Sequence, residues 1–393
     1  MTAACYVANT DPGAELMAGQ VLTLDRQTML RATLRDVSVP LVPSYIGDGE
    51  VRFGTPINPV KVRSLSTFEE RITYLAWRIF LLAERPFPQP VNHAFSCEVV
   101  APGPTEELQQ ETARLVPLFE SGMMKVFLAE ARQIPASLRE IGRLREVTFR
   151  AAGEGTGDPL DIDLFDEHYL HLFIWNAEKA EIVGAYRLSP TDHGPDHLYT
   201  ATLFHYGQEF LSKMGPALEL GRSFVRKEYQ RSFSPLLLLW KGIGKFLAVH
   251  PQYRRLFGPV SISSRYSSLS RELMIAFLER REWLAGLASL VRPRRAPARQ
   301  GAAEYCYDLE DLSDVISDVE CRACGVPVLL RHYLRLGGKL LGFNVDHKFS
   351  DALDGLMLVD LTQTEPALLE RYLGKPEAQS FRDYWKGKEN GTI

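Results

Sequence analysis

The sequence has no long hydrophobic run, few cysteines and no strong charge of either sign. The longest purely apolar stretch near its middle, residues 236–240, is far too short to span a membrane. The five cysteines are scattered, so they do not indicate a disulfide framework, and a reducing compartment fits them better. The first residues lack a basic segment followed by an apolar core, which argues against a signal peptide. We therefore predict a cytoplasmic protein, with peripheral contact at an inner membrane as the alternative.

Charge and metal-ligand spacing argue against two further classes of protein. The formal net charge of −4 over 393 residues gives no basic excess for general nucleic-acid binding. Cys321 and Cys324 form a single C-x-x-C without further ligands at suitable spacing, so we expect no metal site. Apolar residues make up 45% of the chain and charged residues 24%, as in soluble globular proteins. The length suggests two domains or one large one.

Residues 217–225, with the sequence A-L-E-L-G-R-S-F-V, are predicted to form the central strand. Glu219 lies there among apolar neighbours, and a carboxylate is costly to bury unless a charged or hydrogen-bonding group answers it. Glu219 is therefore either part of a structural ion pair, for example with Arg187, or a general base or amine-binding group. On a regular strand Glu219 and Arg222 face opposite sides. Either a bulge re-aims one of them, or Arg222 pairs with the acidic set at 161–166 and is structural.

The chain divides into three predicted parts: residues 1–88, a connector at 89–120, and a larger domain at 121–393. From residue 121 strands and helices alternate, first as a meander and then as strand–helix–strand. This order indicates an α/β fold with a mixed central sheet flanked by helices. The expected strands are 124–129, 169–175, 182–188, 217–225, 256–262, 340–345 and 356–361. We expect one helix to begin at residue 135 and four more to span 235–250, 267–281, 326–336 and 365–373. A polar tail follows the last of them.

Residues 1–88 carry two proline-punctuated strands, at 37–46 and 51–57, and an amphipathic helix at 66–84. The strings V-P-L-V-P and R-F-G-T-P-I in these strands resemble the closing part of the glycerolipid (1-acylglycerol-3-phosphate) acyltransferase domain. That family's chemistry depends on an H-x-x-x-x-D motif, and here no histidine is followed five residues later by aspartate. The resemblance implies a truncated α/β acyltransferase remnant without its catalytic motifs.

A second set of motifs extends over roughly residues 120–360. It consists of an arginine four residues before a phenylalanine, an acidic set, an arginine closing the third strand, an E-x-x-R core strand, and a closing segment at 326–346. The matching residues are Arg145, Phe149, Asp161, Asp163, Asp166, Arg187, Glu219 and Arg222. In this order they resemble the GNAT fold. The pattern is most similar to the ornithine-acyl-carrier-protein N-acyltransferases and the hemolysin-like group, and more distantly to acyl-homoserine-lactone synthases.

The resemblance implies an N-acyltransferase that moves a long fatty acyl chain from an acyl-carrier-protein thioester to the amine of ornithine, glycine or a similar amino acid. Glu219 would be the catalytic base. The implied substrate-binding residues are Arg222, Arg187, Arg145, Phe149, Asp163 and Asp166. By family position alone, Asp346, Asp351 and Asp354 are candidates for the acceptor site. The alternatives are a non-catalytic or membrane-associated hemolysin-like lipid- or acyl-carrier-binding protein and, disfavoured by a missing tryptophan after the first helix, a lactone synthase.

The loop after the core strand, Y-Q-R-S-F-S-P at 229–235, departs from the GNAT pattern. GNAT enzymes ordinarily have a glycine-rich loop there for the coenzyme A pyrophosphate, because glycine allows the backbone to approach phosphate closely. A phosphopantetheine donor on acyl carrier protein demands less of this loop, and acyl-coenzyme A is the alternative donor. Arg231 and Ser232 would bind the donor phosphate, or otherwise cap the next helix. We expect no permanently bound cofactor.

Two basic features suggest a partner. Lys241 and Lys245 lie on one face of the helix at 235–250, and the loop at 292–299 is rich in arginine. They would dock an acidic acyl carrier protein or an anionic membrane surface. The alternative for the arginine-rich loop is simple solvation.

Overall fold

The computed structural model describes most of the chain. Within the described residues, no helix is both long and apolar enough to cross a membrane. For the strands at 2–7 and 20–23 only the backbone is described. The described residues are 2–7, 20–23, 34, 37–47, 50–84, 95, 97–232, 234–299, 301–302, 304–320 and 324–389.

Two compact units make up the chain, and each combines stretches that are far apart in sequence. Unit 1 contains Met1–Val91, Tyr266–Phe277 and Arg299–Arg331. Unit 2 contains Asn92–Arg265, Leu278–Ala298 and His332–Ile393. Unit 1 therefore includes two stretches from the part of the chain predicted as a single domain at 121–393. Local sequence patterns indicate helices and strands, but they carry little information about which distant segments pack together.

Unit 1 has a four-stranded antiparallel sheet in the order β2-β1-β3-β4. A capping box of Thr67 and Glu70 starts α3, and Ile79 and Leu82 of this helix pack on Tyr45 of β3. The strands are β1 (Thr2–Val7), β2 (Gln20–Thr23), β3 (Leu41–Gly47) and β4 (Glu50–Phe53). The helices are α2 (Pro59–Ser64), α3 (Phe68–Ala83) and α10 (Leu309–Glu320).

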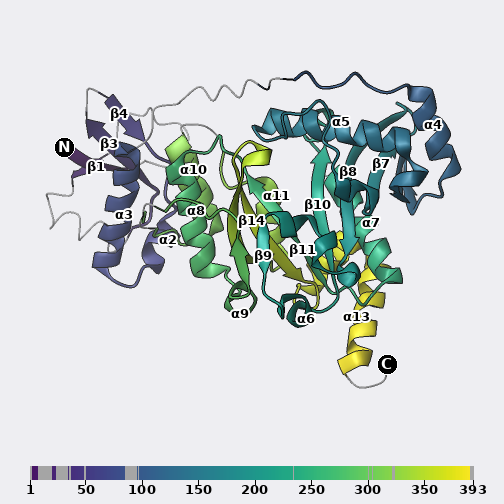
Figure 1. Cartoon of the computed structure of the whole chain (residues 1–393). Coiled ribbons are helices and arrows are strands. Elements are labelled where there is room, and N and C mark those ends of the chain that lie inside the picture. The colour runs from purple at the N-terminus through teal and green to yellow at the C-terminus, as the bar shows by residue number, and fades with distance from the viewer. Residues whose placement is uncertain are drawn as a thin grey trace. The chain divides into compact units, whose positions relative to one another are not determined.

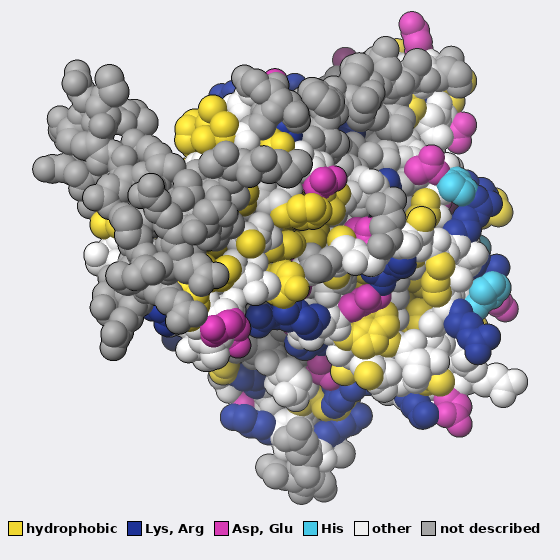
Figure 2. All heavy atoms as spheres, turned by 90° about the vertical axis from the view of Figure 1, so that its left-hand side faces the viewer, with side chains coloured by type: hydrophobic (Ala, Val, Ile, Leu, Met, Phe, Trp, Pro, Cys, Tyr) yellow, Lys and Arg dark blue, Asp and Glu magenta, His cyan; other side chains and the backbone are white. Residues whose placement is uncertain are grey.

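Several large hydrophobic side chains of unit 1 are exposed. On the edge strand β4, Val51 and Phe53 are 53% and 59% exposed, and Ile46 of β3 lies opposite Val51. Figure 2 shows hydrophobic side chains gathered among lysines and arginines on the side of the molecule that it draws. Exposed apolar residues on an edge strand suit further packing against another chain segment.

Unit 2 is organised on an eight-stranded mixed sheet in the order β13-β14-β11-β10-β8-β7-β6-β5. Only the β10–β11 pair is parallel. The strands are β5 (Phe119–Ser121), β6 (Met124–Glu130), β7 (Leu170–Asn176), β8 (Glu181–Pro190), β10 (Ala217–Val225), β11 (Arg255–Ile262), β13 (Lys339–Asp346) and β14 (Ala352–Asp360). A separate pair is formed by β9 (Phe204–Tyr206) and β12 (Val291–Pro293). This sheet confirms the predicted mixed α/β class, while the N-terminal acyltransferase remnant stays a prediction.

Helices α5 and α7 cover opposite faces of this sheet (Figure 1). Ile141 of α5 belongs to a core cluster with Phe173 of β7, whereas Gly242 of α7 lies against Leu172. Successive residues of a strand point to opposite faces, so the two helices lie on different sides. The helices of unit 2 are α4 (Thr105–Arg114), α5 (Pro135–Ala152), α6 (Phe210–Met214), α7 (Ser234–Val249), α9 (Ala285–Ala288), α12 (Pro366–Leu373) and α13 (Lys375–Glu389). The chain passes between the units along α8 (Ser268–Arg281) and α11 (Val328–Arg335).

The central strand β10 is irregular on both of its edges. Its pairing with β11 covers residues 217–219 only, although both strands, fully described, continue beyond that point. Its pairing with β8 shifts register between Gly221 and Phe224, which marks a β-bulge. Within the bulge Arg222 has a left-handed φ of 49°. The edge of β10 that follows Glu219 therefore has no strand partner on the β11 side.

Most predicted elements of unit 2 are confirmed, and the errors have local causes. β10 spans the predicted residues 217–225. β14 begins at Ala352, earlier than the predicted 356, because Asp354 in a buried strand resembles a turn residue. The prediction of a polar tail after residue 373 was wrong, because Lys375–Glu389 forms the helix α13. This helix buries Phe381, and its Trp385 donates a hydrogen bond to the Pro251 carbonyl.

Candidate active site

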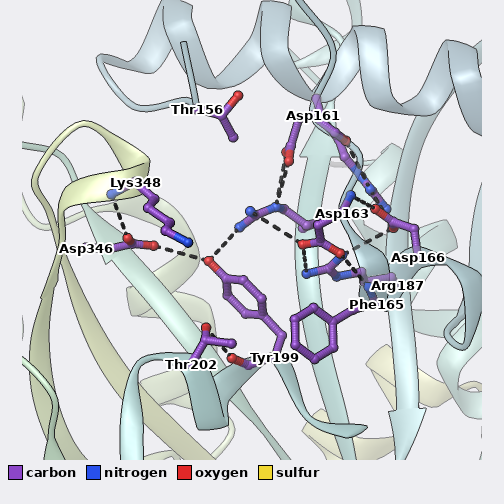
Figure 3. Close-up of polar contacts among 12 residues, drawn as sticks. Thr156, Asp161, Asp163, Phe165, Asp166, Arg187, Tyr199, Thr202, Asp346 and Lys348 are labelled. Atoms are coloured by element: carbon purple, nitrogen blue, oxygen red, sulfur yellow. Dashed lines mark hydrogen bonds and ion pairs between the residues drawn. The ribbon is translucent and has the colours of Figure 1, made fainter. Parts of the chain in front are cut away.

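A loop after α5 brings aspartates onto the sheet through buried arginines (Figure 3). Arg187 of β8 donates to both carboxylate oxygens of Asp163, at 2.7 and 2.9 Å, and its Nη1 lies 3.2 Å from Asp166. Arg145 of α5 donates to Asp166 at 2.8 Å. The Arg145 and Arg187 side chains are both 0% exposed. Both guanidinium groups thus hold the loop from inside the protein, in the bidentate or single-donor geometry typical of arginine–carboxylate pairs.

The charge states in this cluster follow from its pairing. Burial alone would raise the pKa of the Asp166 carboxyl, but Arg145 and Arg187 outweigh it and hold that pKa well below its usual range. Burial, aided by the Arg145 charge, lowers the pKa of His171 to about 4, so its ring is neutral near pH 7. His171 contacts the Asp166 carbonyl oxygen at 2.8 Å. The predicted substrate roles of Arg145, Arg187, Asp163 and Asp166 stay predictions, because the contacts described for these side chains are with one another and with other residues of the chain.

The sequence left two alternatives for Arg222, a bulge that re-aims it or pairing with the acidic set at 161–166, and the structure shows both. The bulge of β10 re-aims its side chain, and its Nε lies 3.2 and 3.1 Å from the two carboxylate oxygens of Asp161. Its Nη1 donates to the Tyr199 hydroxyl at 3.2 Å, and its guanidinium lies 4.7 Å from the Tyr199 ring centre and 4.8 Å from that of Phe349. Arg222 is therefore fixed by one carboxylate and two aromatic rings.

Glu219 is enclosed, with 1% of its surface exposed. It accepts hydrogen bonds from the Tyr169 hydroxyl, from the Thr200 N–H at 2.8 Å and from the Tyr199 N–H at 3.1 Å. Burial raises the pKa of Glu219, and the bonds from Tyr169 and Thr200 only partly oppose this. The ion pairs of Arg187 go to Asp163 and Asp166 in the described structure, so Arg187 is not the ion-pair partner of Glu219 that one of the two alternatives gave as its example. Glu219 anchors the short helix η5 (Tyr199–Thr202) to β10, and its role as base stays a prediction.

Tyr199 links the arginine cluster to the far part of the sheet. Its hydroxyl accepts from Arg222 and donates to Asp346 at 3.1 Å. Asp346, at the end of β13, also accepts the Lys348 N–H at 2.9 Å. Figure 3 shows Tyr199 lying between the aspartates of the loop and Asp346. Hydrogen bonds through the Tyr199 hydroxyl therefore connect Arg222 of β10 with Asp346 of β13, in the region where β10 and β11 are no longer paired.

Sequence reasoning missed one carboxylate of this region, Glu154. It follows the left-handed helix cap Gly153, is 7% exposed, and accepts from the Ser261 hydroxyl of β11 at 2.9 Å. Asp354 of β14, a candidate by family position only, is the register partner of Ser261 and is 4% exposed. Glu154 stands between two glycines in a loop of mixed composition, which by itself indicates only a turn.

The remaining predicted residues lie at the edge of this cluster or outside it. Phe149 is half-buried and meets Phe349 edge-on, with ring centres 5.1 Å apart. Arg231 and Ser232 are exposed in the loop before α7, where the Ser232 hydroxyl accepts the Ser234 N–H at 3.2 Å. This contact agrees with the capping alternative for Ser232, and phosphate binding stays a prediction.

Other binding predictions are not decided by the described contacts. Lys245 forms an ion pair with Glu377 of α13, and the arginines at 292, 294, 295 and 299 are exposed, so partner docking stays a prediction. Among the residues that the structure describes, no group of His, Cys, Asp and Glu side chains is arranged to hold a metal ion. Cys321 of the C-x-x-C lies outside the described residues.

Comparison with known proteins identifies the family. The acetyltransferase (GNAT) domain family matches residues 144–241, which contain Glu219, the predicted donor-site residues and the arginines, phenylalanine and loop aspartates predicted to bind substrate, but not the acceptor-site candidates Asp346, Asp351 and Asp354. A glycine N(alpha)-acyltransferase of Bacteroides thetaiotaomicron is 32% identical over 289 residues, covering 67% of this chain and 85% of that protein. The chain belongs to the glycine N(alpha)-acyltransferase family. It is an acyltransferase, and its GNAT resemblance is confirmed, while the ornithine, hemolysin-like and glycerolipid resemblances stay predictions.

Two further similarities accompany this match. A glycine N(alpha)-acyltransferase of Phocaeicola vulgatus is 29% identical over 291 residues, covering 68% of this chain and 89% of that protein. The solved structure of FeeM, an N-acyl amino acid synthase from uncultured soil microbes, has a TM-score of 0.35 and 10% identity. It covers 64% of this chain and 95% of that one. A likeness at that level supports no conclusion about mechanism.

Proposed function

We propose that this acyltransferase transfers a long fatty acyl group from a thioester to the amine of an amino acid, with glycine as the first candidate. The observation that carries the proposal is the end of β10, where a bulge and an unpaired edge adjoin buried carboxylates. Both curated relatives are named for acylation of glycine. The product would be an N-acyl amino acid, a single-chain amphiphile.

The unpaired edge of β10 suits the thioester carbonyl. Beyond Glu219 the strand continues to Val225 without a ladder partner on the β11 side. Backbone N–H groups at such an edge are free to donate to an oxygen that gains negative charge as the amine attacks. They would stabilise the tetrahedral intermediate more than the planar thioester, which is what lowers the barrier.

For the donor we propose a phosphopantetheine thioester, carried by acyl carrier protein in preference to coenzyme A. The loop after β10 has no glycine, and two of its side chains are used internally. The Tyr229 hydroxyl donates to Glu181 at 2.7 Å, and Gln230 donates to the Val225 carbonyl at 2.8 Å. Arg231 and Ser232 of the same loop are exposed and would meet the single phosphate of the phosphopantetheine arm.

The acceptor's carboxylate needs a cation with a free donor, and Arg222 is the best placed of the three arginines. Its side chain is 10% exposed, and the contact of its Nη2 with Asp163 is long, at 3.9 Å. Arg187 is 0% exposed and has both terminal nitrogens on Asp163. We therefore assign carboxylate binding to Arg222 and a supporting role to Arg187.

A reconstituted reaction tests this proposal. The purified protein would be incubated with a long-chain acyl donor, on acyl carrier protein or on coenzyme A, and with glycine, ornithine or a mixture of the other amino acids. We expect an N-acyl amino acid by mass spectrometry, largest with glycine and acyl carrier protein. Thioester cleavage without any amide, for every acceptor and both donors, would contradict the proposal. Faster reaction with acyl-coenzyme A would overturn only the choice of donor.

A further inference from the structure

We propose that Glu154, Asp354 and Asp346 form the ammonium-binding site of the acceptor, and that Glu154 is the base that deprotonates the amine. The inference rests on the proposed amide-forming function and deepens it by locating the amine. It moves the base from Glu219, at the enclosed part of β10, to the end of α5.

The three carboxylates share one face of the sheet. Ser261 of β11 and Asp354 of β14 are direct register partners, and directly opposed residues of an antiparallel pair point to the same face. Asp354 is likewise opposite Asn344 of β13, so Asp346, two residues later, also lies on that face. Glu154 reaches the same face from the loop after α5, because it accepts a hydrogen bond from the Ser261 hydroxyl at 2.9 Å.

Asp354 is a buried carboxyl group without a partner. It is 4% exposed, and no hydrogen bond or ion pair joins it to another residue of the described chain. Burial raises its pKa well above the usual range, and the nearby Asp346 and Glu154 raise it further, against the opposing effect of Arg222. Its oxygens are not among the side-chain atoms of the described residues that are sealed from solvent without a partner, so they stay open to a ligand. A ligand that supplies several N–H donors and a positive charge, such as a primary ammonium, would satisfy it.

The surroundings of Glu154 suit a base better than those of Glu219. Glu154 accepts one hydrogen bond from the described protein, whereas Glu219 accepts three. Burial raises the pKa of Glu154 to about 7, against the opposing effects of the Ser261 bond and of Arg222 and Arg265. A base whose pKa lies near the working pH combines an available proton site with a useful driving force.

Charged groups from three different segments face Glu154. Arg222 faces it from β10, Arg265 from the segment after β11, and Asp354 from β14. On α5, which ends just before Glu154, Glu146 is engaged with Arg150 at 2.7 Å and with the N–H groups at 156 and 157. Flanking Glu154, Gly153 and Gly155 have left-handed φ values of 81° and 106°, so the turn that presents it depends on glycine.

The reaction balances without a further reactant. Glu154 takes one proton from the ammonium, and the freed nitrogen lone pair attacks the thioester carbonyl carbon. The tetrahedral intermediate collapses by breaking the carbon–sulfur bond, and the leaving thiolate takes the second nitrogen proton. Amide and thiol are the products, and Glu154 returns its proton to solvent.

The test compares kcat/KM for glycine across pH 5.5–9 in the wild type and Glu154→Gln, at saturating donor. We expect an acid limb near pH 7 in the wild type and its loss in the variant, with a fall of ~10²–10⁴-fold at neutral pH. Glu120→Gln, an exposed carboxylate on β5, is the matched control and should keep the wild-type profile. An inactive wild type would contradict the proposed function itself, whereas an active wild type makes the variant decisive.

Ser261→Ala provides a second test of Glu154 if Glu154→Gln folds poorly. Removing the hydroxyl takes away a bond that favours ionised Glu154, so the acid limb should move up by ~0.5–1 pH unit. Asp354→Asn should raise KM for glycine while leaving KM for the donor unchanged. The inference is overturned if Glu154→Gln keeps the acid limb and an activity within about threefold of wild type, or if the limb stays in place in Ser261→Ala.

Discussion

At the residue scale, two buried glutamates of the same sheet region have different surroundings and therefore different properties. Glu219 is held by two backbone N–H groups and a tyrosine hydroxyl, and Glu154 by a single serine. Burial raises the pKa of both carboxyl groups. Hydrogen-bond saturation favours an anchoring role for Glu219, and an open acceptor favours chemistry at Glu154.

Glu219→Gln should act mainly on stability. Its amide nitrogen would confront N–H or O–H donors of Tyr169, Tyr199 and Thr200, leaving at least one of them unsatisfied in the interior. We expect a loss of about 1–3 kcal/mol in the free energy of unfolding, measured by urea denaturation. Activity per folded molecule should fall less than in Glu154→Gln. A fully stable variant that has lost all activity would restore Glu219 as the base.

The pH dependence of stability reports on Glu154 without any substrate. Its folded-state pKa of about 7 lies above the unfolded value of roughly 4.3, so the folded state binds more protons between these values. Its contribution therefore destabilises the fold as pH rises through that window, by at most ~1.4 kcal/mol per pH unit. Urea denaturation of Glu154→Gln should show a flatter profile from pH 5 to 7. Identical slopes for variant and wild type would contradict the assignment.

The contribution of Asp166 to stability changes with pH in the opposite direction, and it does so over a lower pH range. Its folded-state pKa is depressed by Arg145 and Arg187, so its stabilising effect is present above the unfolded pKa of roughly 3.9 and is lost as pH falls below it. Asp166→Asn should be less stable than wild type at pH 6, and the difference should shrink towards pH 3. Acid-denaturation curves followed by circular dichroism would measure this, and a difference that is constant with pH would count against the ion cluster.

At the element scale, the bulge of β10 is the feature that joins the two halves of the site. It turns Arg222 onto the Asp161 side at the point where β11 leaves the strand. The sequence predicted the extent of β10 and stated the alternatives for Arg222. It did not indicate the left-handed residue, because an arginine there carries no turn signal of the kind that glycine or asparagine gives.

A matched pair of substitutions tests the bulge. Arg222→Ala and Arg222→Gly both remove the guanidinium and differ only in the Cβ atom. At a φ of 49° glycine avoids a steric cost of about 1–2 kcal/mol, so Arg222→Gly should be the more stable variant. In a regular strand Arg222→Ala would instead be the more stable variant, by roughly 0.5–1 kcal/mol in the free energy of unfolding. Urea midpoints of the two variants therefore decide between a bulged and a regular strand.

At the scale of the whole molecule, the N-terminal unit depends on residues that are distant in sequence. Arg78 of α3 is 2% exposed and pairs with Asp311 at 3.1 Å and Asp318 at 2.8 Å, both on α10. The Thr55 N–H and hydroxyl also donate to Asp318. Nothing in the local pattern of residues 1–88 or of α10 shows that these charges meet, so the composition of unit 1 was beyond sequence reasoning.

Arg78→Met should therefore destabilise unit 1 strongly. The substitution leaves two buried carboxylates without their cation, a change that typically costs about 3–5 kcal/mol. Arg132→Met is the matched control, because its ion pair with Glu130 is solvent-exposed and should matter little. Thermal unfolding followed by circular dichroism would measure both, and equal effects of the two substitutions would contradict the buried network.

Prediction from sequence succeeded where a pattern was local and failed where contacts were long-range. The mixed sheet and its central strand follow from the order and periodicity of the elements, and the GNAT family was predicted from the resemblance of short motifs. The partners of Arg187 and Glu219, the site of Glu154 and the unpaired state of Asp354 depend on which strands lie side by side. Those contacts join residues of different elements, from 19 positions apart for Thr200 and Glu219 to 107 for Glu154 and Ser261, and hydrophobic periodicity within one element carries no information about them.

The most direct test of the central claim is to feed bacteria that express this chain with ¹⁵N-labelled glycine and analyse their lipid extracts by mass spectrometry. We expect a new N-acylglycine that is one mass unit heavier than the unlabelled product and that is lost in Glu154→Gln but kept in Glu120→Gln. Soluble wild-type protein without any new acylated amino acid, labelled or unlabelled, would contradict it.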